Sequence, residues 1–361
     1  MKIIDIQAFQ LHSHPEKLFF FDRMGRMEFK HVLLRILTDE GVEGNVITYL
    51  MNPDEFASQL DGYRAYLTGK DPHYVEAISQ QLTFGLERPS MGASAIDIAL
   101  WDLLGKIHGE PVYRLLGAAR DRIRAYASTY SYETLDEYVA IALASQQAGF
   151  TALKLHAHGV PDKDIRVCAA VREAVGPDMD LMLDPVNTYD RQGALKVGRA
   201  LEALDYLWLE APILDTDLVG LRELKQRLSI PIAAAESVFQ GLRSSPPYLS
   251  GNLVSALRSV GDAIGGISAM RKVAALCEAY NVKYEPHSYG TTLVQAAHLH
   301  IMLSINHCDF VEVPVPLGMW DTGMKEGITI DPDGYVSAPA KPGLGYEIDE
   351  GAIDALILRA L

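Results

Sequence analysis

Residues 180–236 contain three short apolar segments, DLMLDPV, YLWLEAP and IPIAAAE, and each segment carries one acidic residue at or near its end. These residues are Asp184, Glu210 and Glu236, and each follows the previous one by 26 positions. Such a step is typical of one β-strand followed by one α-helix, and the carboxyl ends of parallel barrel strands converge at one mouth. The segment therefore predicts a β/α barrel with three carboxylates at its mouth.

Three carboxylates that meet at one mouth would repel one another unless a cation neutralised them. Carboxylate oxygens are hard ligands, and a set of this kind suits Mg²⁺. The alternative is that each acid is an ordinary solvated residue at the end of a strand. The equal spacing of all three favours a Mg²⁺ site.

Short strands alternate with amphipathic helices on both sides of this segment, from Arg122 to about Pro316, which is the pattern of repeated βα units. Helical periodicity is present in DIRVCAAVREAVG, ALKVGRALEAL and GISAMRKVAALCEAY. With the three acidic segments, five further strands make eight, and they are RAYAS, TALKLHA, LVSALRSV, VKYEPHS and DFVEVPV.

The chain before the barrel has a different pattern. Residues 2–11 and 31–50 alternate like antiparallel strands, with a hairpin turn at Asp39-Glu40-Gly41, and residues 52–117 are helical. After Pro316 the chain is rich in Gly and Pro, and then forms a short strand and a terminal helix. The fold class is therefore α/β.

We expect two domains. The first is an α+β capping domain over 1–118, with 320–361 packing back on it, and the second is a barrel over 119–319.

Charge and composition limit the partners. The chain has 361 residues, a net charge of −15 and a pI near 5.1, which disfavours nucleic acids and anionic membrane surfaces. An anionic small molecule remains possible, since a bound cation can reverse the field locally. The N-terminus does not resemble a signal peptide, and no apolar run approaches the roughly 18 residues of a membrane span. The three cysteines form no CxxC pair, which indicates a reducing, cytoplasmic location.

The segment 14–30 is expected to be a loop with unusual apolar content, including Phe19, Phe20 and Phe21 beside Arg23 and Arg26. One interpretation is a lid over a pocket, and the other is packing on the first domain.

Four further polar residues occupy strand-end positions: Lys154, His156, His287 and Glu312. Residues two apart on a strand face the same side, so Lys154 and His156 should both point into the mouth. A buried Lys beside a metal can act as a base or stay charged and bind a carboxylate. His156 and His287 lie on expected strands 2 and 7, from which they could approach a substrate from opposite faces; each could also be structural.

Taken together, these motifs resemble the enolase superfamily, and within it the mandelate racemase and muconate lactonizing enzyme group. The resemblance covers essentially the whole chain, and it depends on the order of the motifs more than on any one of them. The motifs are ASAIDIALWDLLGK (93–106), Lys154 with His156, WLEAP, AAAES, GGIS (265–268), PHSYGT (286–291) and PGLG (342–345).

The resemblance implies a modified TIM barrel, (β/α)7β, with an N-terminal α+β capping domain that the C-terminal segment completes. It implies that Asp184, Glu210 and Glu236 hold Mg²⁺, which binds the carboxylate of a substrate. Lys154 would neutralise that carboxylate, and Glu312 would hydrogen-bond it from the far side. The reaction class implied is removal of a proton α to a carboxylate through an enediolate.

Several positions depart from the family pattern. A second Lys is common where this chain has His156, and the Asp that usually orients the strand 7 His falls on Val260. Asp262 lies two residues further on and is a possible substitute. The usual Asp-x-Asn is DPV here, with Asn187 one place late, and Ala211 stands where Glu is common. These changes keep the metal site and alter the acid/base set.

The leading hypothesis is a lyase that dehydrates a sugar acid to a 2-keto-3-deoxy acid, with His residues as base and acid. Racemisation, epimerisation or cycloisomerisation of a hydroxy acid or lactone shares the same enediolate, and a barrel that binds ligand without turnover is a third possibility. The expected partner is a small sugar acid, and we expect a homo-oligomer. Candidate substrate contacts are Arg23, Arg26, Tyr130, Asn187 and Glu312.

Overall fold

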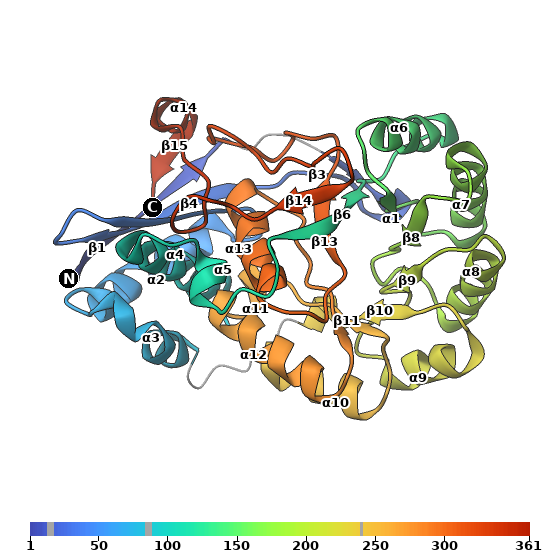
Figure 1. Ribbon diagram of the computed structural model, residues 1–361, viewed down its shortest axis with the longest axis horizontal. Helices are drawn as coiled ribbons and strands as arrows, with labels where there is room; N and C mark the ends of the chain where they lie inside the picture. Colours follow the sequence, from blue (N-terminus) through green and yellow to red (C-terminus); the bar gives the residue numbers. More distant parts are fainter. Residues whose placement is uncertain (13–17, 84–88, 239–240) are drawn as a thin grey trace.

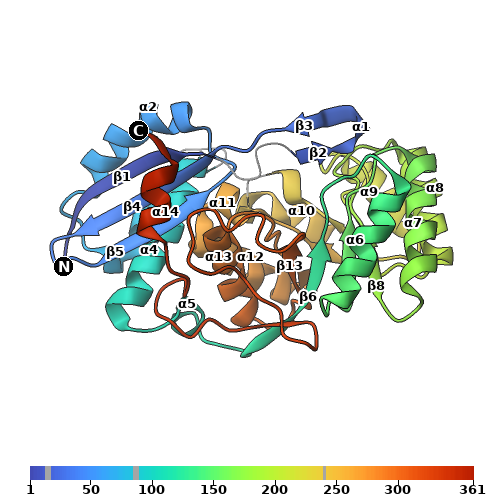
Figure 2. The same cartoon turned by 90° about the horizontal axis from the view of Figure 1, so that it is seen from above.

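The computed structural model describes residues 1–12, 18–83, 89–238 and 241–361, and Figures 1 and 2 show it from two sides. An antiparallel sheet with its helices lies beside a barrel of parallel strands ringed by helices. Within the described ranges, no helix combines the length and apolar character that crossing a bilayer requires.

The antiparallel sheet has the strand order β15-β1-β4-β5. β4 (His31–Thr38) and β5 (Glu43–Thr48) form the hairpin that the sequence predicts, and β1 (Ile3–Leu11) pairs antiparallel with β4. The C-terminal strand β15 (Ile357–Ala360) pairs with β1. Both ends of the chain therefore belong to one sheet. The helices around it are α2 (Pro53–Leu67), η1 (Pro72–Tyr74), α3 (Val75–Leu82), α5 (Val112–Leu115) and α14 (Glu350–Leu356).

Helix α4 (Met91–His108) joins the sheet to the barrel. Fourteen of its 18 residues are buried, as expected of a helix that is covered on all sides. On the sheet side, Gly44 approaches it so closely that a Cβ there would lie 2.1 Å from the carbonyl oxygen of Ala99. On the barrel side, Trp101 Nε1 donates to Ser268 Oγ at 2.9 Å. The two units are thus held in a fixed relation by this helix.

The segment expected to be a loop over 14–30 is partly regular. β2 (Leu18–Phe20) and β3 (Gly25–Met27) pair antiparallel, and the helical turn α1 (Phe21–Met24) joins them. The expectation of a loop is therefore wrong for residues 18–27, where the side chains of Leu18 and Phe21 are buried. Residues 14–17 lie outside the described part of the chain.

The barrel has eight parallel strands in the order β12-β11-β10-β9-β8-β7-β6-β13, as the sequence predicts. Helices follow each of the first seven strands, which confirms the (β/α)7β pattern. The strands are β6 (Arg122–Ser128), β7 (Ala152–Leu155), β8 (Asp180–Leu183), β9 (Trp208–Glu210), β10 (Ile232–Ala234), β11 (Ala256–Leu257), β12 (Lys283–Tyr284) and β13 (Phe310–Pro314). The helices are α6 (Leu135–Gln147), α7 (Pro161–Val175), α8 (Arg191–Ala203), α9 (Leu218–Arg227), η2 (Glu236–Val238), η3 (Gly241–Arg243), α10 (Ser245–Ser250), α11 (Gly261–Ile264), α12 (Gly266–Ala279) and α13 (Thr292–Leu303). A further short strand, β14 (Tyr335–Ser337), pairs antiparallel with β6.

Side chains join the two ends of the barrel sheet, β12 and β13. The Glu285 carboxylate, just after β12, accepts hydrogen bonds from the backbone N–H groups of Asp309 and Phe310 at 2.7 and 3.3 Å. Further along, Ser288 Oγ donates to the carbonyl of Glu312 at 2.8 Å and accepts from its N–H at 3.0 Å. These side-chain bonds add to a backbone hydrogen bond from the N–H of Tyr284 to the carbonyl of His307 at 2.9 Å.

A small apolar cluster lies towards the amino-terminal end of the barrel strands. It includes Tyr126, Met182, Trp208 and Phe310, which project inward from four different strands. Trp208 and Phe310 of this cluster also line a cavity of about 550 Å³ at that end of the barrel. The polar side chains described below gather at the opposite, carboxyl end of the strands.

Candidate active site

Three carboxylates from adjacent strands lie together at the carboxyl end of the barrel. Asp184 directly follows β8, Glu210 ends β9, and Glu236 begins η2, two residues after β10. The register between β9 and β10 pairs Glu210 with Ala233, which brings these strand ends level. One oxygen from each carboxylate lies within 4.8 Å of the other two. This spacing allows a single cation to contact all three residues.

The chemistry of this cluster fits a hard divalent cation. Burial raises the pKa of Glu236 well above its ordinary value, and Arg258 offsets this only in part. Oε2 of Glu236 and Oδ1 of Asn187 are buried oxygens without a hydrogen-bond partner. For Asp184, burial acts in the same direction, but Lys154 and His156 outweigh it and hold the pKa below its ordinary value. Acceptor oxygens that lack donors are the groups that a bound cation would satisfy.

Lys154 of β7 has no exposed surface and contacts three carboxylates. Its Nζ lies 2.9 Å from Glu312 Oε1, 3.1 Å from Glu210 Oε1 and 3.4 Å from Asp184 Oδ2. Burial alone would lower the pKa of Lys154, but Glu210 and Glu312 outweigh it and raise the pKa well above its usual range. The ammonium group is therefore charged, which suits it to bind an anion.

His156 projects from the residue after β7 towards the same cluster. Its Nε2 lies 3.2 Å from Asp184 Oδ2, and its Nδ1 lies 2.5 Å from the carbonyl oxygen of Thr129. The rings of Phe20 and Phe21 lie 6.3 and 6.2 Å from the imidazole, measured between centroids. The small hairpin β2–β3 thus covers this side of the mouth.

His287 approaches from the other side of the barrel, after β12. Its Nε2 is 3.9 Å from Glu236 Oε1, and burial, with further lowering by Arg258 and Lys154, brings its pKa to about 3. The ring of Tyr289 lies near both imidazoles, with centroids 6.1 Å from His156 and 6.3 Å from His287. The two His residues therefore share one aromatic neighbour.

The possibility that Asp262 replaces the missing partner of His287 is not supported. Asp262 Oδ2 accepts from Thr48 Oγ1 at 3.5 Å, and Nδ1 of His287 is buried without a hydrogen-bond partner. Val260 is bridged to His287 through the backbone, and its apolar side chain cannot supply the carboxylate. Asp262 lies two residues further on, in α11, and its carboxylate faces Thr48 of the capping sheet instead.

Glu312 of β13 is fully buried, and protein donors already contact both of its oxygens. Oε1 faces Lys154 and accepts from Ser128 Oγ at 2.7 Å, while Oε2 accepts from Arg258 Nη2 at 3.0 Å. Burial would raise the pKa of Glu312, but Lys154 and Arg258 hold it well below its ordinary value. Its carboxylate fixes the positions of both cations.

The remaining candidate substrate contacts occupy different surroundings. Arg23 is exposed, and Arg26 forms an ion pair with Glu133 in which both side chains are about 60% exposed. Tyr130 packs its ring 4.6 Å from that of Tyr132. Neither arginine contacts the acidic cluster among the described residues. Asn187 lies close to it, and its Nδ2 donates to Ser237 Oγ, next to Glu236.

Arg258 is the principal site residue that the sequence reasoning missed. It is 1% exposed, and its Nε lies 2.7 Å from Glu210 Oε1. A charged residue in the otherwise apolar segment LVSALRSV is the signal that could have identified it. Tyr289 was missed for a different reason: its contact with His156 joins distant parts of the chain.

The hairpin also makes polar contacts with the barrel. The N–H of Phe21 donates to Ser131 Oγ at 3.1 Å, and Asp22 accepts from His158 Nδ1 at 2.9 Å and from Lys163. Burial would raise the pKa of Asp22, but Lys163 and His158 lower it. These contacts tie α1 to the loops after β6 and β7.

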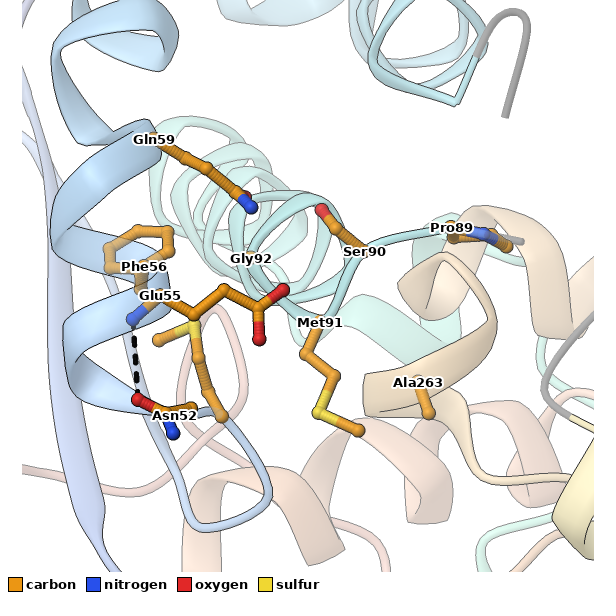
Figure 3. Close-up of a pocket in the computed structure, with 10 residues that line it drawn as sticks. Asn52, Glu55, Phe56, Gln59, Pro89, Ser90, Met91, Gly92 and Ala263 are labelled. Atoms are coloured by element: carbon orange, nitrogen blue, oxygen red, sulfur yellow. Dashed lines mark hydrogen bonds between the residues drawn. The ribbon is translucent and has the colours of Figure 1, made fainter. Parts of the chain in front are cut away.

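A separate cavity of about 200 Å³ lies in the capping unit, between α2 and the start of α4. Figure 3 shows Glu55 of α2 and Met91 of α4 projecting into it. None of the residues of the acidic cluster lines this cavity. We therefore place the candidate active site at the barrel mouth.

Two family models match the chain and together cover most of its length. Residues 9–117 match the N-terminal domain of mandelate racemase and muconate lactonizing enzyme, and residues 137–352 match the enolase C-terminal domain-like family. A capping domain of this kind beside a barrel with a triad of acids defines the enolase superfamily. This chain belongs to its mandelate racemase and muconate lactonizing enzyme family.

The chain is similar to enzymes that act on sugar acids. It is 30% identical to D-galactarolactone cycloisomerase from Agrobacterium fabrum over 98% of both chains. It is 32% identical to D-galactonate dehydratase from Ralstonia nicotianae over 91% of each. The structure of D-glucarate dehydratase from Agrobacterium tumefaciens, complexed with magnesium, has a TM-score of 0.86 and 28% identity, and the match covers 99% of this chain and 100% of that one.

Proposed function

We propose that this chain is a Mg²⁺-dependent enzyme that removes the proton α to the carboxylate of a sugar acid and then eliminates a β-hydroxyl group. The product of that reaction is a 2-keto-3-deoxy acid. The observation that carries the proposal is the meeting of Asp184, Glu210 and Glu236 beside Lys154, in a chain whose relatives are sugar acid dehydratases and cycloisomerases.

The residues of the site have separate roles in this proposal. Asp184, Glu210 and Glu236 would hold the ion, which supplies positive charge where the substrate carboxylate gains electron density. Lys154 binds and orients that carboxylate with its charged ammonium group. His156 follows β7 and His287 follows β12, and in this proposal one imidazole takes the α-proton while the other protonates the leaving hydroxyl.

Cycloisomerisation is a second candidate, and the match to D-galactarolactone cycloisomerase over 98% of both chains favours it. The first step is the same removal of the α-proton. A ring oxygen then leaves in place of a hydroxyl group, so the product keeps every atom of the substrate. Nδ1 of His287 has no hydrogen-bond partner, so we infer that the acid/base residues decide between these outcomes.

The test is incubation of the protein with a library of acid sugars and their lactones in D₂O with Mg²⁺. Dehydration would release a 2-keto acid that is detected with semicarbazide, whereas cycloisomerisation would give an isomer of unchanged mass apart from solvent deuterium. Exchange of the α-proton without a product would show that the substrate class is correct and that only the first step of the reaction takes place. No exchange with any acid would overturn the proposal in favour of a barrel that binds ligand without turnover.

A further inference from the structure

Arg258 is fixed in the centre of the barrel by contacts on every side of its guanidinium group. Nη1 donates to the carbonyl of Glu285 at 2.8 Å and lies 3.3 Å from the hydroxyl of Tyr126. Nη2 donates to Glu312 Oε2 at 3.0 Å. Nε lies 2.7 Å from Glu210 Oε1. The hydrogen bonds of Nη1 and Nη2 hold the guanidinium group beside the carboxylates, whereas the contact of Nε with Glu210 is an ion pair without hydrogen-bond geometry.

Arg258 also contacts two of the three acids of the proposed Mg²⁺ site. Besides Glu210, its Nε lies 3.5 Å from Glu236 Oε2, an oxygen that has no hydrogen-bond partner. Guanidinium does not lose its proton in proteins, so this positive charge is permanent. Any cation that binds between Glu210 and Glu236 must therefore bind close to a fixed positive charge.

Six residues joined by ion pairs form what we call the mouth cluster. Four are carboxylates and two are cations, which leaves a formal charge of −2 when all four carboxylates are ionised and both imidazoles are neutral. That charge matches a single divalent ion. The members are Asp184, Glu210, Glu236, Glu312, Lys154 and Arg258.

We propose that Arg258 is a specificity-determining residue of the metal site, where its fixed charge sets the mouth cluster at −2. This charge weakens the binding of every cation. It weakens the binding of trivalent ions more than that of divalent ions, because Coulomb repulsion scales with the charge of the ion. This inference rests on the proposed Mg²⁺ site and adds to it. Without Arg258 the mouth cluster would carry a formal charge of −3 and would favour ions of higher charge.

The experiment measures metal binding directly, with no need for a substrate. Calorimetry gives the Kd of Mg²⁺, and Tb³⁺ is followed by its luminescence, because Trp208 Nε1 donates to Glu210 Oε2 at 3.1 Å and its indole can sensitise a bound ion. Arg258→Gln should lower the Kd of Mg²⁺ at least tenfold. The logarithm of the change for Tb³⁺ should be about 1.5 times that for Mg²⁺, in the ratio of the ionic charges.

Three further variants separate charge from position. Arg258→Lys keeps the charge and should keep both affinities near those of the wild type. Arg258→Gln combined with Glu312→Gln restores the formal charge of −2 and leaves Lys154 paired. This double variant should bind both ions with affinities within about threefold of those of the wild type. Arg124→Gln removes a cation that pairs with Asp180 at the other end of the barrel, and should change neither affinity. The double variant serves as the test if the single variant does not fold.

Unchanged or weaker binding of both ions by Arg258→Gln would overturn this inference while leaving the metal site in place. Equal changes for Mg²⁺ and Tb³⁺ would also overturn it. A wild-type protein that binds neither ion would overturn the proposed metal site, and this inference with it.

Discussion

Lys154 and Glu312 meet in the centre of the barrel mouth, with Nζ 2.9 Å from Oε1 and no solvent exposure of either side chain. They come from β7 and β13, which pair with β6 on its two sides. Because the same ammonium group also contacts Glu210, one cation holds together carboxylates from distant parts of the sequence. Its loss should therefore affect both stability and function.

Replacement of Lys154 by Met should lower the free energy of unfolding by about 3–5 kcal/mol, because it leaves buried carboxylates without their cation. It should also abolish turnover. Urea unfolding in EDTA measures the stability of the metal-free protein. Lys163→Met, at a side chain that is 47% exposed, should cost less than about 1 kcal/mol. Equal stability of the two variants would contradict this prediction.

Removal of divalent ions with EDTA should abolish activity, and Mg²⁺ should restore it. A bound ion also stabilises the folded state, by about 2.7 kcal/mol when the free ion is at 100 times its Kd. Thermal unfolding with and without Mg²⁺ measures this shift. Asp184→Asn should remove most of it, whereas Asp178→Asn, outside the cluster, should not. Full activity in EDTA would show that the acids have another purpose.

Replacement of His287 by Asn should reduce turnover by roughly 10²–10⁴-fold, the usual contribution of a general acid or base, while the Kd for Mg²⁺ stays the same. His156→Asn should also reduce turnover. The variant that lacks the general base should lose α-proton exchange in D₂O, and the variant that lacks only the general acid should keep it. Comparison of the two variants therefore shows which His is the base and which is the acid. Near wild-type turnover of His287→Asn would move its role to His156.

Glu285 should make the protein less stable as the pH rises from about 4.5 to about 7. Burial raises the pKa of this carboxyl from 4.5 to about 7, so the folded state prefers the protonated form. Its contribution is complete below the unfolded pKa and is lost as the pH rises through the folded pKa, by about 3 kcal/mol in total. Urea unfolding of wild type and Glu285→Gln across this range should show that the difference between them changes with pH. A constant difference would refute the assignment.

Shortening Phe20 to Ala should raise KM more than it lowers the melting temperature, if the hairpin acts as a lid. The ring of Phe20 lies 6.3 Å from that of His156, and it also contacts Phe29. Met24→Ala, at a 46% exposed position of the same hairpin, is the matched control. A melting temperature lower by several degrees with unchanged kinetics would instead favour a packing role.

Local sequence patterns predict most of the fold. The equal spacing of Asp184, Glu210 and Glu236 predicts the β/α repeat, because each unit needs one strand and one helix. The alternation around Asp39-Glu40-Gly41 predicts the β4–β5 hairpin, which is present. Short pairings are harder to predict: Leu18 pairs with Met27 in strands of three residues each, which is too short for a clear period.

The candidate site could be predicted only where chemistry coincides with strand ends. Lys154 and the three acids meet that condition. Arg258 directly follows β11 as well, but its role depends on its contacts with Glu210 and Glu312, which lie 48 and 54 positions away in the sequence. Arg26 shows the opposite problem, since its ion pair with Glu133 spans 107 positions and leaves it on the surface. Contacts at such separations are set by the assembled fold.

The contacts between β12 and β13 also link completion of the site to the last step of barrel folding. Ser288 bonds the backbone of Glu312 on both sides, and Glu312 in turn holds Lys154. The final barrel strand must therefore dock before the ammonium group has all its partners, so synthesis of the chain up to β12 cannot yield a finished pocket. Protection of the Glu312 amide from hydrogen exchange would time this last step of assembly.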